Sequence, residues 1–241
     1  MVTNDREKET QMTMRYISLV ALTFAAVANV FASPVEVFDN STVVLGKRSL
    51  SDGGIPGEGT SNGFFYSVFS DSTVTGTYTN GGSGQYSVSW GGSGDLVVGK
   101  GWNPGSARTV TYSGTWQPNG NSYLSVYGWT TGPLVEYYIM ESFGTFNPST
   151  GATFHGTCTS DGSSYNIYTT TRVNAPSIQG TATFTQILSI RNSHRVGGTV
   201  TTANHFNCFK SLGLAMGAFN YMIVATEAFS STGTASITVQ S

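Results

Sequence analysis

Residues 122–130 read SYLSVYGWT, and their character alternates along the chain. Tyr123 and Tyr127 fall on one set of alternate positions, whereas Leu124 and Val126 fall on the other. Successive side chains of a β-strand point to opposite faces of its sheet, so this period of two predicts a strand. One of its faces is aliphatic and suited to a core, and the other is aromatic and able to form hydrogen bonds.

The same alternation recurs in short runs separated by glycine-rich turns. The further predicted strands are residues 83–90, 108–112, 135–141, 164–173, 179–191, 220–229 and 234–240. Turn signals occur at residues 80–82, 118–120, 147–148 and 160–162. Short strands at this density, separated by such turns, predict an all-β antiparallel sandwich or jelly roll.

One stretch, residues 202–216, has a different period. Its apolar residues are Phe206, Phe209, Leu212 and Met216, which have helical spacing. The sequence therefore predicts a single helix here.

Composition limits the classes of function. The chain has 241 residues and a net charge of -2, and 10% of its residues are charged, against about 25% in an average soluble domain. A slightly acidic chain lacks the basic surface of a nucleic-acid-binding protein. Two cysteines and three histidines leave little for a zinc cluster. We expect no cofactor, no metal and no nucleic acid, and a polar, weakly charged surface suited to sugars.

The N-terminal segment resembles a processing sequence. Residues 14–32 have a basic start, an apolar stretch and a small-residue site before Ser33, which predicts a secretory signal peptide from about Met14. Residues 1–32 would then be an upstream extension plus this signal, and the protein would be secreted to the extracellular space. A membrane anchor is the alternative, but the apolar stretch is too short and too interrupted to form a membrane-spanning helix.

A polar segment, residues 33–48, follows and ends in the dibasic pair Lys47-Arg48. It contains the sequence's N-glycosylation signal, at Asn40. We expect it to be a propeptide whose removal leaves residues 49–241 as the functional domain. The alternative is an ordered N-terminal arm.

Two glutamates lie on aromatic strand faces. Glu136 shares a face with Tyr138, and Glu227 shares one with Tyr221 and Phe229. Aromatic faces stack on sugar rings, and tyrosine hydroxyls bond sugar hydroxyls. Alternatively, such faces belong to a core and each glutamate pairs with an arginine.

Two motifs decide between these readings. Residues 133–139 (PLVEYYI) and 223–227 (IVATE) strongly resemble glycoside hydrolase family 11, the small β-jelly-roll endo-1,4-β-xylanases. Further similar segments are residues 98–105, 123–130, 171–178 and 199–207. The resemblance covers about residues 63–240. It implies two twisted antiparallel sheets, one helix, and a thumb hairpin over an open cleft, with Pro176, Ser177 and Ile178 at the thumb tip.

The resemblance also implies the active-site roles. Glu136 would be the nucleophile and Glu227 the acid/base of a retaining double displacement on xylan and xylo-oligosaccharides. The implied sugar-binding residues are Phe69, Tyr123, Tyr127, Trp129, Tyr138, Arg172, Pro176, Ser177, Gln186, Tyr221 and Phe229. We expect a monomer, with a proteinaceous xylanase inhibitor as a partner at the cleft.

Asp95 occupies the position that lies beside the acid/base in the family. The resemblance implies that family members with Asp at this position work at acid pH. We expect Asp95 and Glu227 to share a hydrogen-bonded proton and the pH optimum to fall below 6. The alternative is a surface loop acid.

Four positions depart from the family pattern. Phe69 and Leu188 replace tryptophans, Ala228 replaces a glycine, and Phe229 replaces a tyrosine. These changes predict weaker sugar binding, and backbone strain at Ala228 if the family glycine has a positive φ. They keep open two alternatives: a non-hydrolytic carbohydrate-binding or partner-recognised protein on the same jelly roll, and a hydrolase of β-glucan.

Some relatives bridge the strand-end loop and the helix with a disulfide at the positions of Ser160 and Asn204. Here the two cysteines are Cys158 and Cys208, and we expect them to bridge; two buried free thiols are the alternative. We expect structural roles for the remaining polar candidates, with the basic ones solvated or bridging. These are Glu141, His155, His205, Lys100, Arg191 and Arg195.

Overall fold

The computed structural model describes residues 42–44, 57–71 and 73–240, all within the unit Val35–Ser241. The predicted signal peptide, the glycosylation signal and the dibasic pair lie outside these residues. Three residues of the predicted propeptide are described and form strand β1 (Thr42–Val44), which pairs with β4. Across the described part of the chain, no helix is both long and apolar enough to cross a membrane.

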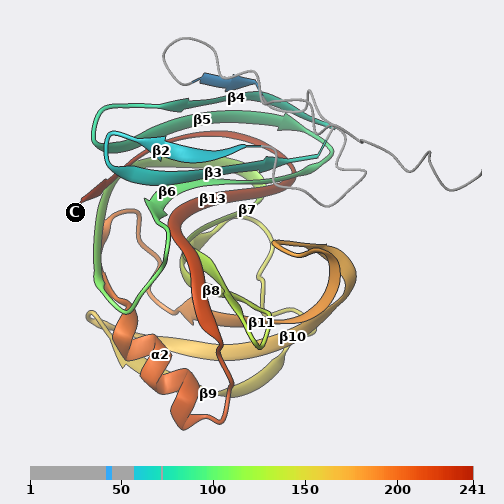
Figure 1. Cartoon of the computed structure of the whole chain (residues 1–241), viewed down its shortest axis with the longest axis vertical. Helices are drawn as coiled ribbons and strands as arrows, with labels where there is room; N and C mark the ends of the chain where they lie inside the picture. The colour runs from blue at the N-terminus through green and yellow to red at the C-terminus, as the bar shows by residue number, and fades with distance from the viewer. Residues whose placement is uncertain (1–41, 45–56, 72, 241) are drawn as a thin grey trace, which may run out of the picture. The chain divides into compact units, whose positions relative to one another are not determined.

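Strands make up most of the fold (Figure 1). The remaining strands are β2 (Gly57–Ser61), β3 (Phe64–Ser70), β4 (Val74–Asn80), β5 (Gly84–Gly92), β6 (Asp95–Trp102), β7 (Thr109–Thr131), β8 (Val135–Phe143), β9 (Thr153–Ser160), β10 (Ser163–Ser177), β11 (Gly180–Arg191), β12 (Gly198–Thr201) and β13 (Ala218–Gln240). The hydrogen-bonded order is β1-β4-β5-β13-β7-β8-β11-β10-β9, with β12 on β7, β6 on β13, β3 on β6 and β2 on β3. The pair β8–β11 is parallel. This arrangement confirms the all-β prediction.

The strands form two layers that share β7 and β13. The first half of β7 and the second half of β13 pair with each other and with β12 and β5, respectively. Their other halves pair with β8 and β6 in the second layer. Leu124 and Val126 are fully buried in the core between the layers, whereas Tyr123 and Tyr127 belong to a separate cluster on the other face. The predicted two-faced strand is therefore present.

The sequence predicted breaks in β7 and β13 that are wrong. Residues 118–120 are not a turn, and β13 runs on between its two predicted halves. A register shift between Phe229 and Thr232 places two residues of β13 opposite Gly120, which is a β-bulge. Gly120 has φ +119°, and a Cβ there would lie 2.7 Å from the Cβ of Ser231. Its glycine signal therefore marks a bend within a strand rather than a chain reversal.

Helix α2 (Thr202–Ser211) ends earlier than predicted. Gly213 has φ +75°, and its N–H donates to the carbonyl of Lys210 at 3.1 Å. The N–H of Leu214 donates to the carbonyl of Phe209 at 2.9 Å. Together these bonds form a Schellman motif, which terminates a helix at a glycine. The predicted apolar position Met216 packs on the core from the segment that follows the helix.

A disulfide joins Cys158 of β9 to Cys208 of α2, with their Cα atoms 6.3 Å apart. Ser160 and Asn204, the positions that the family resemblance gave for a bridge, are also in contact, because the Asn204 side chain donates to Ser160 Oγ at 3.0 Å. The disulfide spans 50 residues of sequence. Closing a loop of this size stabilises the fold by about 4 kcal/mol in the chain-entropy model.

Two groups of buried charges lie away from the aromatic face. Glu141 is fully buried and pairs with Arg195 and Arg191, so this acid is bridged as expected. Lys100 is also fully buried, contrary to a solvated role. Its Nζ donates to the carbonyls of Ser83 at 3.1 Å and Gly81 at 3.3 Å, which ties the β4–β5 turn to β6. Burial lowers its pKa to about 8.

The two histidines of interest also make structural contacts. His205 Nδ1 lies 2.8 Å from Ser189 Oγ, and burial lowers the pKa of His205 to about 4. His155 Nε2 lies 2.7 Å from Thr169 Oγ1. Neither histidine lines the cleft described below.

Candidate active site

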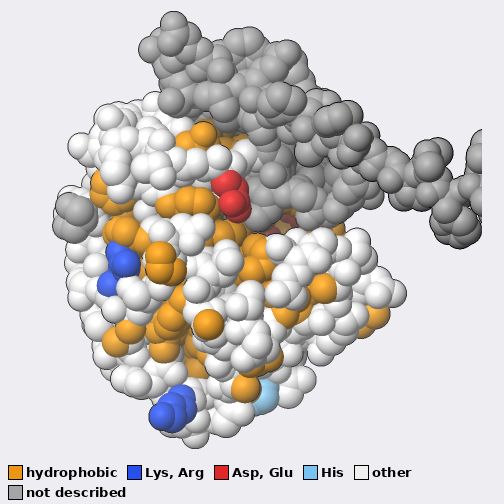
Figure 2. All heavy atoms as spheres, in the orientation of Figure 1, with side chains coloured by type: hydrophobic (Ala, Val, Ile, Leu, Met, Phe, Trp, Pro, Cys, Tyr) orange, Lys and Arg blue, Asp and Glu red, His pale blue; other side chains and the backbone are white. Residues whose placement is uncertain are grey.

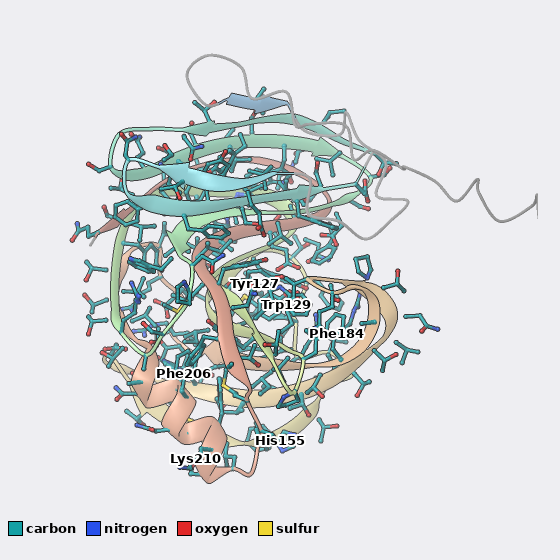
Figure 3. All side chains as sticks on the ribbon, in the orientation of Figure 1. Tyr127, Trp129, His155, Phe184, Phe206 and Lys210 are labelled. Atoms are coloured by element: carbon teal, nitrogen blue, oxygen red, sulfur yellow. A yellow bond between two sulfur atoms is a disulfide. The ribbon has the colours of Figure 1, made fainter. Side chains whose placement is uncertain are left out.

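The aromatic face of the second layer lines a cleft of about 320 Å³, with the β10–β11 hairpin forming part of its wall. Every residue predicted to bind sugar or carry catalysis lies in its lining, as does Asp95. Trp129 of β7 packs against Phe184 of β11 on one side and Tyr127 on the other (Figure 3). The face drawn in Figure 2 carries few charged side chains, which matches the sequence's low charge.

Strand register brings the predicted residues together. Glu136 of β8 lies opposite Trp129 of β7 on one side and Gln186 of β11 on the other. Glu227 of β13 lies opposite Tyr123 of β7. Directly opposed residues of neighbouring strands project to the same face. Pairing therefore assembles on one face side chains that are far apart in the sequence.

Glu136 is 7% exposed, and both its carboxylate oxygens accept hydrogen bonds. Oε1 accepts from the Tyr127 hydroxyl at 2.7 Å and from the Tyr138 hydroxyl at 3.0 Å. Oε2 accepts from Gln186 Nε2 at 2.6 Å. Burial raises the pKa of Glu136, and these three bonds oppose that rise because they favour the charged form.

A further hydrogen bond and a ring contact orient these donors. The indole N–H of Trp129 donates to the Tyr127 hydroxyl at 2.7 Å. Because a hydroxyl carries one proton, this bond leaves the proton of Tyr127 for Glu136. The rings of Tyr127 and Tyr138 lie 4.9 Å apart between centroids, so both hydroxyls reach the same oxygen.

Glu227 is 3% exposed and lies close to Glu136. The Tyr138 hydroxyl that bonds Glu136 also lies 3.3 Å from Oε1 of Glu227. The two bridged oxygens can be no farther apart than the sum of these bond lengths. That limit lies below the ~6.5 Å at which the carboxyl separations of inverting glycosidases begin.

The two carboxyl groups differ in proton affinity. Burial raises the pKa of Glu227 well above its usual range, and the charges of Asp95 and Glu136 raise it further. Glu227 has one bridging contact, to Tyr138, whereas Glu136 accepts three hydrogen bonds. At a pH between the two pKa values, the proton therefore sits on Glu227 and the charge on Glu136.

Asp95 is the first residue of β6 and lines the cleft rather than lying on a surface loop. It pairs with Phe229, two residues from Glu227 on β13, so Asp95 and Glu227 are diagonal neighbours on one face. Oδ1 of Asp95 and Oε2 of Glu227 are both buried without a hydrogen-bond partner, so the hydrogen bond expected between the two carboxyl groups is not formed by these atoms. Burial raises the pKa of Asp95 to about 7, helped by the charges of Glu136 and Asp71.

Three of the four residues that depart from the family pattern lie in the cleft wall, and the fourth is buried beside it in the sequence. Phe69, Leu188 and Phe229 line the cleft, and the ring of Phe229 packs edge-on against Tyr123 at 5.6 Å. Ala228 is buried, and it is not among the non-glycine residues with positive φ. The backbone strain considered for Ala228 is therefore absent.

The sequence pattern missed part of the cleft wall. Lining residues without a predicted role in sugar binding are Val97, Met140, Phe146, Pro148, Thr150, Ala152, Thr170, Ala175, Ile178, Phe184 and Leu188. Alternation could have found Phe184, which lies two residues before Gln186 on β11. Nothing local marks the segment from Phe146 to Ala152, because its place in the wall depends on tertiary contact. Among the described residues, no group of three or more His, Cys, Asp or Glu side chains is arranged to hold a metal ion.

Comparison with known proteins gives a consistent result. The family model for glycosyl hydrolases family 11 matches residues 61–238. The chain is 58% identical over 221 residues to ethylene-inducing xylanase 1 of Botryotinia fuckeliana, covering 91% of this chain and 76% of that protein. It is 55% identical over 222 residues to probable endo-1,4-β-xylanase B of Aspergillus clavatus, covering 92% and 98%. A solved structure from a comparison of two major endo-1,4-β-xylanases of Trichoderma reesei aligns with a TM-score of 0.66 and 48% identity, over 69% of this chain and 93% of that one.

Proposed function

Because this chain belongs to glycosyl hydrolase family 11, we propose that it is an endo-1,4-β-xylanase that cleaves internal bonds of xylan with retention of configuration. The observation that carries this proposal is the pair of buried carboxyl groups bridged by the Tyr138 hydroxyl in the cleft. Their close approach supports retention, since an inverting enzyme needs room for a water molecule between substrate and base.

In the proposed first step, Glu136 attacks the anomeric carbon while Glu227 protonates the departing glycosidic oxygen. The C–O bond to the leaving sugar breaks, and a covalent glycosyl ester of Glu136 forms. In the second step, Glu227 takes a proton from a water molecule that attacks the same carbon. The ester breaks, Glu136 recovers its charge, and Glu227 recovers its proton.

The charge of Glu136 couples the two steps. While Glu136 is ionised, its charge contributes to the raised pKa of Glu227, which keeps Glu227 protonated as the acid. Formation of the ester removes that charge, so the pKa of Glu227 falls. The same side chain is thereby prepared to act as a base in the second step.

Asp95 is proposed to move the working range toward acid. Proton donation by Glu227 beside an ionised Asp95 would leave two negative groups in contact, which is unfavourable in a buried site. A proton on Asp95 removes this penalty. With the pKa of Asp95 raised to about 7, activity should increase as pH falls below neutral, until Glu136 also becomes protonated. These two limits support an optimum on the acid side of neutral pH.

Asp95→Asn should raise the pH optimum by about one unit. Asparagine carries no charge and does not titrate, so Glu227 would act as an acid without requiring a second proton nearby. The measurement is kcat/KM on soluble xylan from pH 3 to 9 for both proteins. An optimum that does not move, or that lies at neutral pH in the unaltered protein, would show that Asp95 does not control Glu227.

Secretion is part of the proposal. It is supported by the signal-like residues 14–32 and by the Cys158–Cys208 disulfide, which suits an oxidising compartment.

Release of reducing sugar from xylan and from carboxymethyl cellulose tests the proposed activity. We expect release from xylan alone. Release from carboxymethyl cellulose instead would favour a β-glucan hydrolase. Binding to xylan without release from either polymer would favour a non-hydrolytic carbohydrate-binding protein.

A further inference from the structure

A pair of aromatic side chains, one exposed and one partly buried, lies beyond the cleft at the edge of the second layer. Phe154 of β9 is 56% exposed, and its ring centroid lies 5.3 Å from that of Tyr168 on β10. Phe154 and Tyr168 are directly opposed in the β9–β10 pairing and so share a face. β9 ends the hydrogen-bonded row, as Figure 1 shows.

This face continues the floor of the cleft. Tyr168 lies opposite Leu188 of β11, and Leu188 lies opposite Tyr138 of β8. Tyr168 packs against the cluster of aromatic and aliphatic side chains that includes Tyr138 and Leu188. Three strand spacings of ~4.8 Å separate Tyr138 from Phe154, so Phe154 lies about 14 Å from Tyr138 across the sheet.

A second path along the chain leads from the cleft to the same place. Ala152 lines the cleft and lies directly before β9, two residues from Phe154. Thr170 also lines the cleft. It lies two residues after Tyr168 on the same strand, β10, so both side chains project to one face. The aromatic pair is therefore connected to cleft-lining residues through β10 and through the segment that leads into β9.

The chemistry of the pair suits a sugar. An exposed phenyl ring offers an apolar face for the C–H face of a pyranose, and the neighbouring tyrosine supplies a hydroxyl for sugar hydroxyls. No charged side chain is needed to recognise the neutral backbone of xylan. Leu188, which stands in the row between Tyr168 and Tyr138, offers no aromatic ring for stacking, so a ring platform farther along the row would restore one.

We propose that Phe154 and Tyr168 form an additional sugar-binding subsite, which holds xylose units of a long chain at the β9–β10 end of the cleft. This inference rests on the proposed function. The occupant is the substrate chain itself, because the surface is continuous with the cleft in which that chain is cleaved. Short oligosaccharides that fill only the central cleft would not reach it.

Phe154→Ala should lower kcat/KM about fivefold to tenfold on polymeric xylan and xylohexaose, mainly through a higher KM. On xylotriose the variant should equal the unaltered protein. Phe154→Trp should restore the preference for long chains, because it keeps an aromatic face. Val196→Ala is the matched control, since Val196 is also exposed and apolar but does not line the cleft. Val196→Ala should leave kcat/KM unchanged on both long and short substrates.

Binding gives a readout that does not depend on turnover. In a Glu136→Gln background, calorimetric titration should show Phe154→Ala weakening xylohexaose about fivefold to tenfold and leaving xylotriose unchanged. Equal effects of Phe154→Ala on both chain lengths, or none on either, would overturn the subsite. A change in sedimentation without a change in chain-length preference would assign Phe154 to contact between copies and would likewise overturn it. If the unaltered protein cleaves no xylan, the proposed function fails as well, and this result is seen before any variant is compared.

Discussion

Glu136→Gln should lower kcat/KM on every xylan by at least about 10⁴-fold, as removal of a catalytic nucleophile does in other hydrolases. An amide cannot supply the electron pair that forms the glycosyl ester. The amide keeps the shape of the side chain, and its oxygen can still accept from Tyr127 and Tyr138, which now donate to Oε1 at 2.7 and 3.0 Å. The measurement is reducing-sugar release, with single-turnover experiments to show whether a covalent intermediate still forms.

Stability measurements separate this effect from unfolding. The folded-state pKa of Glu136 is raised by burial, so its ionised form costs free energy in the folded protein once pH exceeds the unfolded value of about 4.5. Glu136→Gln removes that cost. Its Tm should therefore equal or exceed that of the unaltered protein at pH 7, and the difference should shrink as pH falls through the raised folded-state pKa of Glu136 and vanish below about 4.5.

A matched control is available on the second layer. Glu58→Gln changes an exposed glutamate on β2 that does not line the cleft. It should leave kcat/KM on xylan unchanged. Full activity in Glu136→Gln, or an equal loss in Glu58→Gln, would contradict the assignment of Glu136 as the nucleophile.

Glu227→Ala should lower kcat/KM on xylan by about 10²- to 10⁴-fold, the usual contribution of a general acid. Its effect on formation of the glycosyl ester from an activated aryl xyloside should be far smaller. A sugar leaving group needs a proton as the C–O bond breaks, whereas a phenolate stabilised by its ring departs without one. The alanine variant should also lose the alkaline limb of the pH profile for ester formation, because that limb reflects proton donation by Glu227 beside Asp95, and the aryl leaving group does not need this donation.

The two substrates decide the outcome. The rate of the first phenolate released in a pre-steady-state burst should be retained in Glu227→Ala, while steady turnover falls because no base activates the water. Accumulation of the glycosyl ester, detected as an increase in protein mass, would accompany this burst. Equal losses on xylan and on the aryl xyloside, without a burst, would show that Glu227 is not the acid/base.

The one-dimensional pattern determined which side chains share a face. Alternation along residues 122–130 predicted a buried aliphatic face and an aromatic face, and the structure has both. It also predicted that Glu136 and Glu227 stand among aromatic residues, because the period of two is a property of the extended backbone itself. The family resemblance added the residues that line the cleft, and all of them do so.

Only the tertiary structure decided how the strands are continued. Gly120 reads as a turn in the sequence, but the pairing of β7 with β13 holds it in a bulge. The apolar spacing of residues 202–216 continues past Gly213, whose positive φ ends the helix. For Gly120 the long-range pairing of β7 with β13 selects the bulge over a turn, whereas at Gly213 the local bonds of the Schellman motif end the helix.

The electrostatic character of the site was also beyond the sequence. Burial is the largest cause of the raised pKa values of Glu136, Glu227 and Asp95, and burial depends on which distant strands cover each side chain. The same holds for Lys100, whose charge gave no sign that it would be fully buried. Residue type and spacing determine what a side chain can do, whereas desolvation and the distance to other charges, which only the folded chain sets, determine which protonation state it holds.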